Sequence, residues 1–406
     1  MSGTSSSTVE RVLDGQLCTG CGLCASVASG QIAMSTVAPG SSRPALRDSI
    51  SPHAEKVIAA ACPGAVVESW PRAAEVHPYW GPSFRVATGH ASDQDVRHKG
   101  SSGGALTALA VFALRSGLVD RVVHIAADPD RPTRNIVTCS TTESEIVEGA
   151  GSRYASSSPL MDIDRMLADG GAMAFIGKPC DVSALRRLGH VDPRVTEHIP
   201  LMLSFFCAGI PSHDGADRVL AAMGVEPQEV SAFRYRGNGW PGKARAETFD
   251  GRVAEMTYAE SWGGHLSKEV QFRCKICPDG VGGSADVACA DAWYGGESGY
   301  PSFDEEDGRS LIITRTAVGE RLLSRALAAG DLTAEPLLAT EIDAMQPSQA
   351  RRKRLLRSRL LALAATFQAK PRMDGVMVRE AAGRAGLGEE IKSFLGTVRR
   401  IVMGRR

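Results

Sequence analysis

The sequence has no hydrophobic run long enough to cross a membrane. Its longest apolar stretches lie at residues 104–114 and 360–367, whereas a membrane-spanning helix needs roughly 18 apolar residues or more. The opening MSGTSSSTVERVL also lacks the basic region and apolar stretch of a secretory signal. We therefore expect no transmembrane helix and a cytoplasmic protein. In that reducing compartment, ten cysteines indicate metal or redox chemistry rather than disulfides.

The chain also has no net charge, but its charges are unevenly distributed. Residues 351–406 carry 15 Lys and Arg against 4 Asp and Glu, which leaves 31 against 42 for the rest of the chain. Basic and apolar residues alternate there at near-helical spacing without an aromatic stacking platform, so no nucleic-acid partner is expected. The pattern predicts a helical tail packed on the body with solvated charges. The alternative is attachment to an anionic surface at the inner membrane or to a protein partner.

One cysteine is missing from an iron-sulfur pattern near the N-terminus. CTGCGLC supplies Cys18, Cys21 and Cys24, but an alanine stands where the fourth cysteine of a bacterial-type motif would be. In two-cluster ferredoxins the fourth cysteine of each motif precedes a proline and binds the other cluster. Cys62 and Pro63 supply that dipeptide, so the four cysteines predict one 4Fe-4S cluster. A zinc site is the alternative, although zinc sites usually pair two CxxC units.

The middle of the chain alternates strands and helices. Residues 84–91 and 120–128 are predicted as strands, and residues 99–117 as a glycine-rich turn followed by an apolar helix. Residues 101–104 would stand at the N-terminus of that helix, where free N–H groups and the helix dipole favour a phosphate. The segment is neither a Walker loop nor GxGxxG, so a helix cap without a ligand is the alternative.

Four further cysteines lie where a second metal centre could form. Cys180 and Cys207 each follow an apolar run that predicts a strand of a parallel sheet, and ligands bind at the carboxyl edge of such sheets. Cys274 and Cys277 form a CxxC pair further along. The four thiolates predict a second cluster, and the alternative is that the cysteines are small core residues.

Several motifs together resemble the beta-subunit family of coenzyme F420-reducing hydrogenases and formate dehydrogenases, which includes the 7-hydroxymethyl chlorophyll a reductases. The motifs run in order between about residues 80 and 320: HKGSSGGALTAL, AFIGKPCDVSALRRL, FFCAGIPS and CKICPDGVGGSADVACADAW. The resemblance implies FAD bound in the α/β body, a 4Fe-4S cluster on the second cysteine quartet, and a partner that exchanges hydride with the flavin.

The resemblance also implies which residues contact the flavin. One group of candidates is Lys99, Gly100, Ser101, Ser102, Gly103 and Gly104. A second candidate contact is formed by Ser152, Arg153 and Tyr154. The chain departs from the family where members often have Gly-Asp, because it has Cys289, Ala290 and Asp291 there, and Cys289 is either an alternative ligand or a bystander. Cys139 has no assigned role, and both cysteines are expected to be small buried residues.

A few side chains are candidates for proton transfer near the flavin. Lys178 and His98 are the catalytic candidates, and Lys178 would also hold negative charge on the reduced flavin or bind a phosphate. Further candidates for proton transfer are Asp279, Asp286 and Asp291. The loop RYRGNGWPGK offers Arg234, Arg236 and Lys243 to an anionic substrate or cofactor, unless it is a turn with solvated charges.

The expected fold is α/β, mixed α+β, in four regions. They are a ferredoxin-like iron-sulfur module (1–78), an N-terminal flavin-binding α/β region (79–165), a C-terminal iron-sulfur and flavin region (166–345) and a basic helical tail (346–406). A flavin exchanges both single electrons and hydride, so it can join two 4Fe-4S clusters to an organic molecule. The first cluster is expected to be the port for a ferredoxin-like carrier and the second a relay to FAD.

The predicted function is therefore an iron-sulfur flavoprotein oxidoreductase acting on a small organic substrate or on the deazaflavin coenzyme F420. The sequence also leaves open a homo-oligomer. Two other classes of function stay as alternatives: an electron-transfer subunit of a larger complex without its own substrate, and a zinc-stapled binding protein without redox activity.

Overall fold

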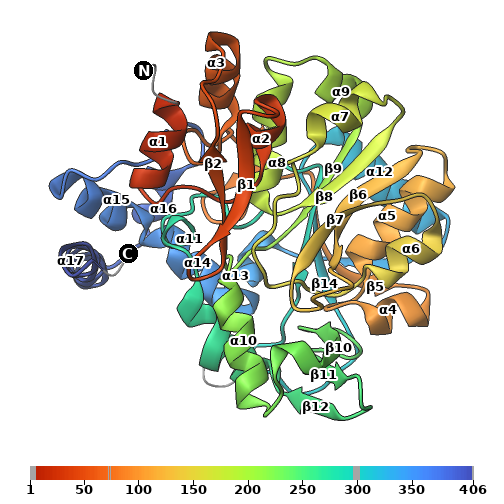
Figure 1. The fold of residues 1–406 in the computed structure, drawn as a ribbon. Coiled ribbons are helices and arrows are strands. Elements are labelled where there is room, and N and C mark those ends of the chain that lie inside the picture. The colour runs from red at the N-terminus through yellow and green to blue at the C-terminus, as the bar shows by residue number, and fades with distance from the viewer. Residues whose placement is uncertain (1–5, 72, 74, 296–301, 405–406) are drawn as a thin grey trace.

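The computed structural model describes residues 6–71, 73, 75–295 and 302–404 of the chain. Its centre is an eight-stranded mixed sheet in the order β15-β5-β14-β13-β9-β8-β6-β7 (Figure 1). The ladders β6–β8, β8–β9 and β9–β13 are parallel, and the other four are antiparallel. The predicted α/β fold class is confirmed. The strands of this sheet are β5 (Arg85–Ala91), β6 (Arg121–Ala127), β7 (Asn135–Ser140), β8 (Met173–Gly177), β9 (Leu201–Phe205), β13 (Val287–Asp291), β14 (Ser310–Thr314) and β15 (Leu332–Pro336).

Helices cover both faces of the central strands. β8 and β9 have the near-continuous apolar sequences MAFIG and LMLSF, as is typical of parallel strands buried on both sides. α5 (Ala105–Arg115) and α12 (Ala317–Ala328) share a hydrophobic core with one face of the sheet. α8 (Pro179–Gly189) shares another core with the opposite face. The sheet is therefore a middle layer between helices.

The predicted elements of the middle region are confirmed. The strands expected at 84–91 and 120–128 are β5 and β6, and the apolar helix between them is α5. Cys180 lies in the first turn of α8 directly after β8, and Cys207 follows β9. Because β8 and β9 are parallel neighbours, both cysteines lie at the same carboxyl edge of the sheet.

The N-terminal module is a small hairpin flanked by helices. It contains α1 (Ser7–Asp14), α2 (Leu23–Val27), β1 (Ile32–Val37), β2 (Ser41–Leu46) and α3 (Pro52–Ala61). α3 begins where the Ser51 side chain accepts a hydrogen bond from the Ala54 N–H and proline occupies the first turn. Leu23 and Ala61 pack in the same core as α8, which holds the module against the sheet.

The predicted helical tail is confirmed. Its main helices are α14 (Pro347–Arg354), α15 (Leu356–Ala365), α16 (Val378–Ala382) and α17 (Leu387–Val402). Leu356, Leu363 and Ile401 of the tail pack with Val12 and Leu17 of the N-terminal module. The two ends of the chain therefore share a core, at the left of Figure 1.

The remaining elements complete the periphery. A three-stranded antiparallel sheet contains β10 (Val230–Arg234), β11 (Ala244–Thr248) and β12 (Val253–Met256), and a short hairpin contains β3 (Glu75–His77) and β4 (Gly81–Ser83). The other helices are α4 (Gln94–Lys99), α6 (Glu143–Glu148), α7 (Ile163–Ala168), α9 (Arg194–His198), α10 (His213–Ala222), α11 (Phe272–Lys275), α13 (Ile342–Met345), η1 (Pro227–Glu229), η2 (Ala259–His265), η3 (Leu266–Glu269) and η4 (Ala339–Glu341). In the described ranges, no helix combines the length and apolar character needed to cross a bilayer.

Strand β5 connects two of the predicted regions. It belongs to region 79–165 but lies between β14 and β15 of region 166–345, so the two regions contribute to one sheet. The boundaries themselves stay predictions. The expectation that Cys139 is buried is wrong, because it lies on the edge strand β7 and is exposed. Cys289, on the interior strand β13, is buried as expected.

Candidate functional site

The first cysteine quartet converges between α2 and α3. Gly22 begins α2 with φ of 88°, and a Cβ there would lie 2.8 Å from the Met161 N, so only glycine fits this turn. Cys62 ends α3. Burial and then the neighbouring Cys18 raise the pKa of Cys62 to about 11. Burial and then the Cys21, Cys62 and Cys18 thiols raise the pKa of Cys24. The four predicted thiols are therefore brought together.

The second cysteine quartet lines one small cavity. Its walls include Cys180, Cys207, Cys274 and Cys277, the four residues predicted. The Ile210 N–H donates a hydrogen bond to the Cys274 Sγ at 3.4 Å. Burial and then the Cys274 thiol raise the pKa of Cys207 to about 12. Thiols from three separate segments thus face one space at the carboxyl edge of the sheet.

The two quartets are neighbours. Thr19, the residue after Cys18, lines the cavity of the second quartet. The Arg273 Nη2 donates a hydrogen bond to the Pro63 carbonyl at 3.0 Å, so the segment before Cys274 touches the segment after Cys62.

Among the residues described, no three His, Cys, Asp or Glu side chains are grouped so that they could hold one metal ion. Tetrahedral zinc with Zn–S bonds of about 2.3 Å would need its sulfurs within about 4 Å of one another.

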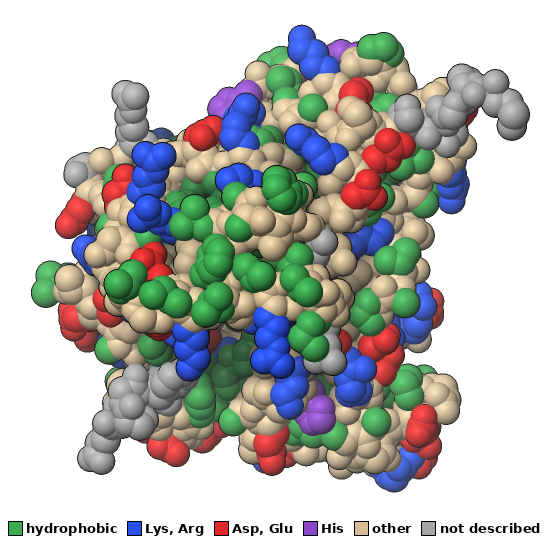
Figure 2. All heavy atoms as spheres, turned by 90° about the vertical axis from the view of Figure 1, so that its left-hand side faces the viewer, with side chains coloured by type: hydrophobic (Ala, Val, Ile, Leu, Met, Phe, Trp, Pro, Cys, Tyr) green, Lys and Arg blue, Asp and Glu red, His purple; other side chains and the backbone are tan. Residues whose placement is uncertain are grey.

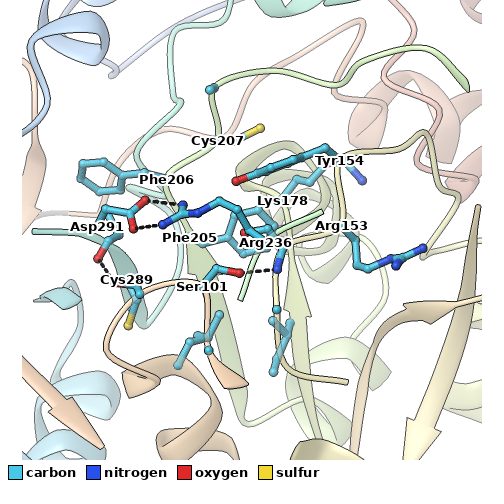
Figure 3. A pocket seen from close by; sticks show the side chains of 18 of the residues that line it. Ser101, Arg153, Tyr154, Lys178, Phe205, Phe206, Cys207, Arg236, Cys289 and Asp291 are labelled. Atoms are coloured by element: carbon cyan, nitrogen blue, oxygen red, sulfur yellow. Dashed lines mark hydrogen bonds and ion pairs between the residues drawn. The ribbon is translucent and has the colours of Figure 1, made fainter. Parts of the chain in front are cut away.

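A larger cavity of about 300 Å³ adjoins the second quartet. The two cavities share Cys207, Gly209 and Ile210 in their walls. The larger one opens at the carboxyl ends of β8 and β9, where sequence reasoning expected a ligand. Figure 3 shows its labelled wall residues, from Ser101 to Asp291, around a common space.

The glycine-rich turn forms one wall of this cavity. Gly104 precedes α5 with φ of 72°, and a Cβ there would lie 2.6 Å from the Val96 carbonyl oxygen. The Ser152 N–H donates to the Ser101 Oγ at 2.5 Å, which ties the turn to the second predicted flavin segment. The Ser102 Oγ donates to the Arg309 carbonyl at 2.8 Å. The N-terminus of an 11-residue helix is thus held at the cavity, where its dipole favours an anion.

Lys178 supplies a buried positive charge to the cavity. Its Nζ lies 2.7 Å from the Asp181 Oδ2 and donates to the Ser157 Oγ at 3.3 Å. Burial favours the neutral amine, but the neighbouring Asp181 and Cys180 side chains together raise the pKa of Lys178 above its usual range. The side chain is therefore a cation inside the wall.

A second ion pair and an aromatic group form another wall. The Arg236 Nη1 and Nη2 donate to the two Asp291 carboxylate oxygens at 3.0 and 2.8 Å. The Trp240 Nε1 donates to the Asp291 Oδ1 at 2.7 Å, and the Trp240 ring stacks on Trp293 with centroids 4.7 Å apart. The Arg236 guanidinium lies 4.6 Å from the centroid of the Tyr258 ring. These contacts fix one planar cation among planar rings.

Most of the predicted flavin residues line the large cavity. Those in its wall are Gly100, Ser101, Ser102, Gly104, Ser152, Arg153, Tyr154 and Lys178. Three predicted residues are not in its wall: Lys99, whose Nζ lies 2.7 Å from Asp95; Gly103, which lies against Gly89; and His98, which is exposed on α4.

The other candidates from the sequence are divided among several places. Asp291 and Arg236 line the large cavity, whereas Asp279 lines the small one. Asp286 lies in the interior, 2.9 Å from Arg186, and accepts a hydrogen bond from the Met202 N–H. Arg234 donates to the Lys99 and Ala150 carbonyls, and Lys243 pairs with Glu255 at the surface.

Sequence reasoning missed several wall residues, including Tyr258, Trp293 and two glutamines of the tail. The Gln346 Nε2 donates to the Asp291 carbonyl at 2.8 Å, and the Gln349 Nε2 donates to the Cys207 carbonyl at 3.2 Å. Trp293 could have been predicted as a wall residue, because it lies two positions after the candidate Asp291 in the sequence. The glutamines carried no such signal, because their segment reads only as the start of a basic helix.

Two family models match the chain, and both describe the beta subunit of coenzyme F420 hydrogenase/dehydrogenase. The model for the N-terminal part of that subunit matches residues 86–163. The model for its C-terminal part matches residues 170–339. Together they cover the sheet and both walls of the large cavity up to the tail.

Individual proteins are similar over the same part. The coenzyme F420 hydrogenase subunit beta of Methanosarcina barkeri is 26% identical over 274 residues, which cover 64% of this chain and 84% of that protein. The chloroplastic 7-hydroxymethyl chlorophyll a reductase of Oryza sativa subsp. japonica is 25% identical over 240 residues, 59% of this chain and 49% of that protein. The F420-dependent formate dehydrogenase subunit beta of Methanocaldococcus jannaschii is 28% identical over 228 residues, 55% of this chain and 57% of that protein.

A solved structure has the same fold. A chain from the F420-reducing NiFe hydrogenase complex of Methanosarcina barkeri superposes with a TM-score of 0.56 and 21% sequence identity. The match covers 73% of this chain and 98% of that one.

Proposed function

The chain belongs to the coenzyme F420 hydrogenase/dehydrogenase beta-subunit family, and from this premise we propose that it is an iron-sulfur flavoprotein oxidoreductase. It would exchange electrons between a one-electron carrier of the ferredoxin type and a small organic substrate or coenzyme F420. The observation that carries the proposal is the serial arrangement of two thiol quartets and a ligand-sized cavity.

We propose that each thiol quartet holds one 4Fe-4S cluster. Four thiols converge in each place, and backbone N–H groups donate to two of the sulfurs, Cys18 Sγ from Gly20 and Cys274 Sγ from Ile210. Such donors stabilise the negative charge of a cluster.

The large cavity is proposed as the flavin site. Its volume of about 300 Å³ lies at the lower end of the range of cofactor and ligand pockets, so part of an FAD would extend beyond it. The N-terminus of α5 and the Ser101 to Ser152 contact would bind phosphate, and buried Lys178 would hold negative charge near the ring. Bound FAD supplies exchange between one-electron and hydride chemistry.

The order of the groups supports electron flow through the protein. The first quartet adjoins the second through Thr19 and through the hydrogen bond from Arg273 to Pro63. The second quartet adjoins the large cavity through Cys207. An electron entering at the first quartet would thus pass the second before it reaches the flavin, and the same route serves the reverse direction.

A second candidate function is an electron-transfer subunit without a substrate of its own. It is favoured by the relatives that are named as beta subunits of hydrogenases and formate dehydrogenases. This candidate predicts a stable complex on affinity capture and a flavin that no small molecule reoxidises.

The deciding experiment is a cofactor analysis of anaerobically purified protein. Iron, acid-labile sulfide, zinc and flavin are measured per chain together with the visible spectrum, and we expect about eight iron and one FAD. Reduced protein is then mixed with coenzyme F420 and with oxidised ferredoxin, and flavin reoxidation is followed by absorbance. Zinc without flavin would refute the proposal.

A further inference from the structure

Helix α17 turns an apolar stripe away from the protein. Leu387, Ile391, Leu395 and Val402 are 73%, 51%, 58% and 77% exposed. At about 100° per residue, these four positions fall within one quarter of the helix circumference. The helix is held to the body through other positions, such as Ile401, which is 9% exposed and packs in the core shared with the N-terminal module.

Helix α15 and the turn after it add two more exposed apolar side chains. α15 packs beside α17, and Leu361 and Phe367 are 52% and 96% exposed. We call these two residues and the four of α17 the α15/α17 face. Figure 2 looks at the side of the molecule that carries these helices and shows hydrophobic side chains gathered across its middle. A gathered apolar surface of this kind marks an interaction site.

Uncompensated cations lie around the α15/α17 face. Arg357, Lys370, Lys392 and Arg399 are exposed, and within the described part of the chain none of their side chains forms a hydrogen bond or ion pair. Lys392 and Arg399 each lie about 100° or less from a stripe residue on the same helix, so their charges border the apolar stripe. Figure 2 shows Lys and Arg side chains along the border of the hydrophobic area.

The acidic residues of this region do not cancel that charge. Of the four Asp and Glu after residue 350, Glu389 already pairs with Arg351 at 2.8 Å and Arg354 at 3.2 Å. The thirteen Lys and Arg between 351 and 404 therefore exceed the acids by nine. The α15/α17 face thus combines an apolar centre with a positive border.

We propose that the α15/α17 face attaches the protein peripherally to an anionic lipid bilayer, with α17 lying along the interface. Apolar side chains would enter the boundary between headgroups and acyl chains, while the bordering cations meet lipid phosphates. With 16 residues and a rise of 1.5 Å each, α17 would cover about 24 Å of surface. No described helix is suited to span the bilayer, so the attachment is superficial.

Charge favours a bilayer over a second copy of this chain. In a two-fold dimer through this face, each copy would present the same bordering cations to the other, and like charges would meet at the rim. An anionic lipid surface instead neutralises them. The charge of the α15/α17 face is therefore complementary to anionic lipid headgroups and not to the same face of a second copy.

The test is co-sedimentation of the full chain, purified with its cofactors, with lipid vesicles. Phosphatidylcholine vesicles are compared with vesicles containing roughly one quarter phosphatidylglycerol, at low salt and then at high salt. We expect the protein to sediment with the anionic vesicles only and to be released by salt. Absence of sedimentation with anionic vesicles would refute the proposal.

Two pairs of variants separate the apolar and the charged contributions. The double variant Ile391→Glu and Leu395→Glu is expected to weaken binding about tenfold or more, because a charge in the apolar stripe opposes insertion. Its control is Phe249→Glu, which changes a residue that is 79% exposed in the turn between β11 and β12. Lys392→Gln with Arg399→Gln is expected to weaken binding to anionic vesicles. Its control is Arg321→Gln, an exposed cation on α12.

Far-UV circular dichroism and the thermal midpoint confirm that each variant is folded. Binding that the glutamate variant leaves unchanged would refute the proposal. So would a concentration-dependent dimer in analytical ultracentrifugation that the same variant dissociates, because the face would then join two copies of the chain.

Discussion

The Arg273 Nη2 donates a hydrogen bond to the Pro63 carbonyl oxygen at 3.0 Å, and this contact joins the two cysteine quartets. Arg273 is 2% exposed, and its Nε and Nη1 have no hydrogen-bond partner among the described residues. Its charge acts to lower the pKa of Cys62 and Cys274, against the burial that raises the pKa of both. One buried cation therefore acts on a thiol of each cysteine quartet.

Replacing Arg273 should make bound clusters harder to reduce. Arg273→Met removes a buried positive charge, so the additional negative charge of a reduced cluster is less well stabilised. We expect both reduction potentials to become more negative in a titration followed by electron paramagnetic resonance. Arg273→Lys keeps the positive charge, so its reduction potentials should lie close to those of the wild type. Potentials unchanged in the methionine variant would contradict this role.

Each cysteine quartet should lose its iron separately. Cys24→Ser is expected to remove about four iron per chain and leave the flavin bound, since none of the four cysteines of the first quartet lines the large cavity. Cys277→Ser should remove a similar amount and also alter the flavin spectrum, because its quartet adjoins the cavity. Iron and flavin analysis checks both. The matched control is Cys139→Ser on the exposed edge strand, which should keep all iron and flavin.

Gly104 should be intolerant of a side chain. Gly104→Ala combines a φ of 72° with a Cβ 2.6 Å from the Val96 carbonyl oxygen, so both strain and a clash arise. Gly117→Ala is the matched control, because its φ is 68° but nothing lies within 4 Å of the added Cβ. We expect about 1 kcal/mol of destabilisation in the control from backbone strain alone. Urea unfolding should show a larger loss at Gly104, together with weaker flavin retention.

The ion pair between Arg236 and Asp291 should be worth more than a surface pair. Asp291→Asn leaves the buried guanidinium without its carboxylate, and the expected loss of unfolding free energy is about 3 kcal/mol. Glu255→Gln, which breaks the surface pairs with Lys243 and Arg245, should leave the urea midpoint almost unchanged. Equal losses in the two variants would show that the buried pair adds nothing specific.

Acid should destabilise the protein through His124. Burial lowers the pKa of this side chain below the value of about 6.5 expected in the unfolded chain. The folded state therefore binds the proton less readily, and its stabilisation is complete above the unfolded pKa and decreases as pH falls through the folded pKa. We expect the thermal midpoint of the wild type to fall between about pH 7.5 and about pH 5. His124→Gln should flatten part of that decrease.

Features that depend on short-range patterns were predictable. The strands β6, β8 and β9 are mostly apolar runs bounded by turn residues, and α5 begins directly after its glycine-rich turn. The cysteine spacing and the Cys62-Pro63 pair were sufficient to group the first four thiols. The second group needed the additional rule that parallel strands share one carboxyl edge, together with the resemblance to a known family.

Features that depend on long-range packing were not predictable from the sequence. His98 directly precedes the predicted flavin segment that begins at Lys99, but it is exposed because α4 turns it toward solvent. Gln346 and Gln349 reach the cavity from the tail, more than 130 residues after Cys207. Cys139 is exposed because β7 has a neighbour on one side alone, and edge position follows from the order of all eight strands.

The position of β5 between β14 and β15 has a consequence for biosynthesis. β5 is among the first strands of the body to be translated, yet its two neighbours end at Thr314 and Pro336. The sheet therefore cannot close during translation until β14 and β15 have left the ribosome, and contacts this distant in sequence form slowly. Cofactor delivery in the cell is then expected to follow synthesis of β15.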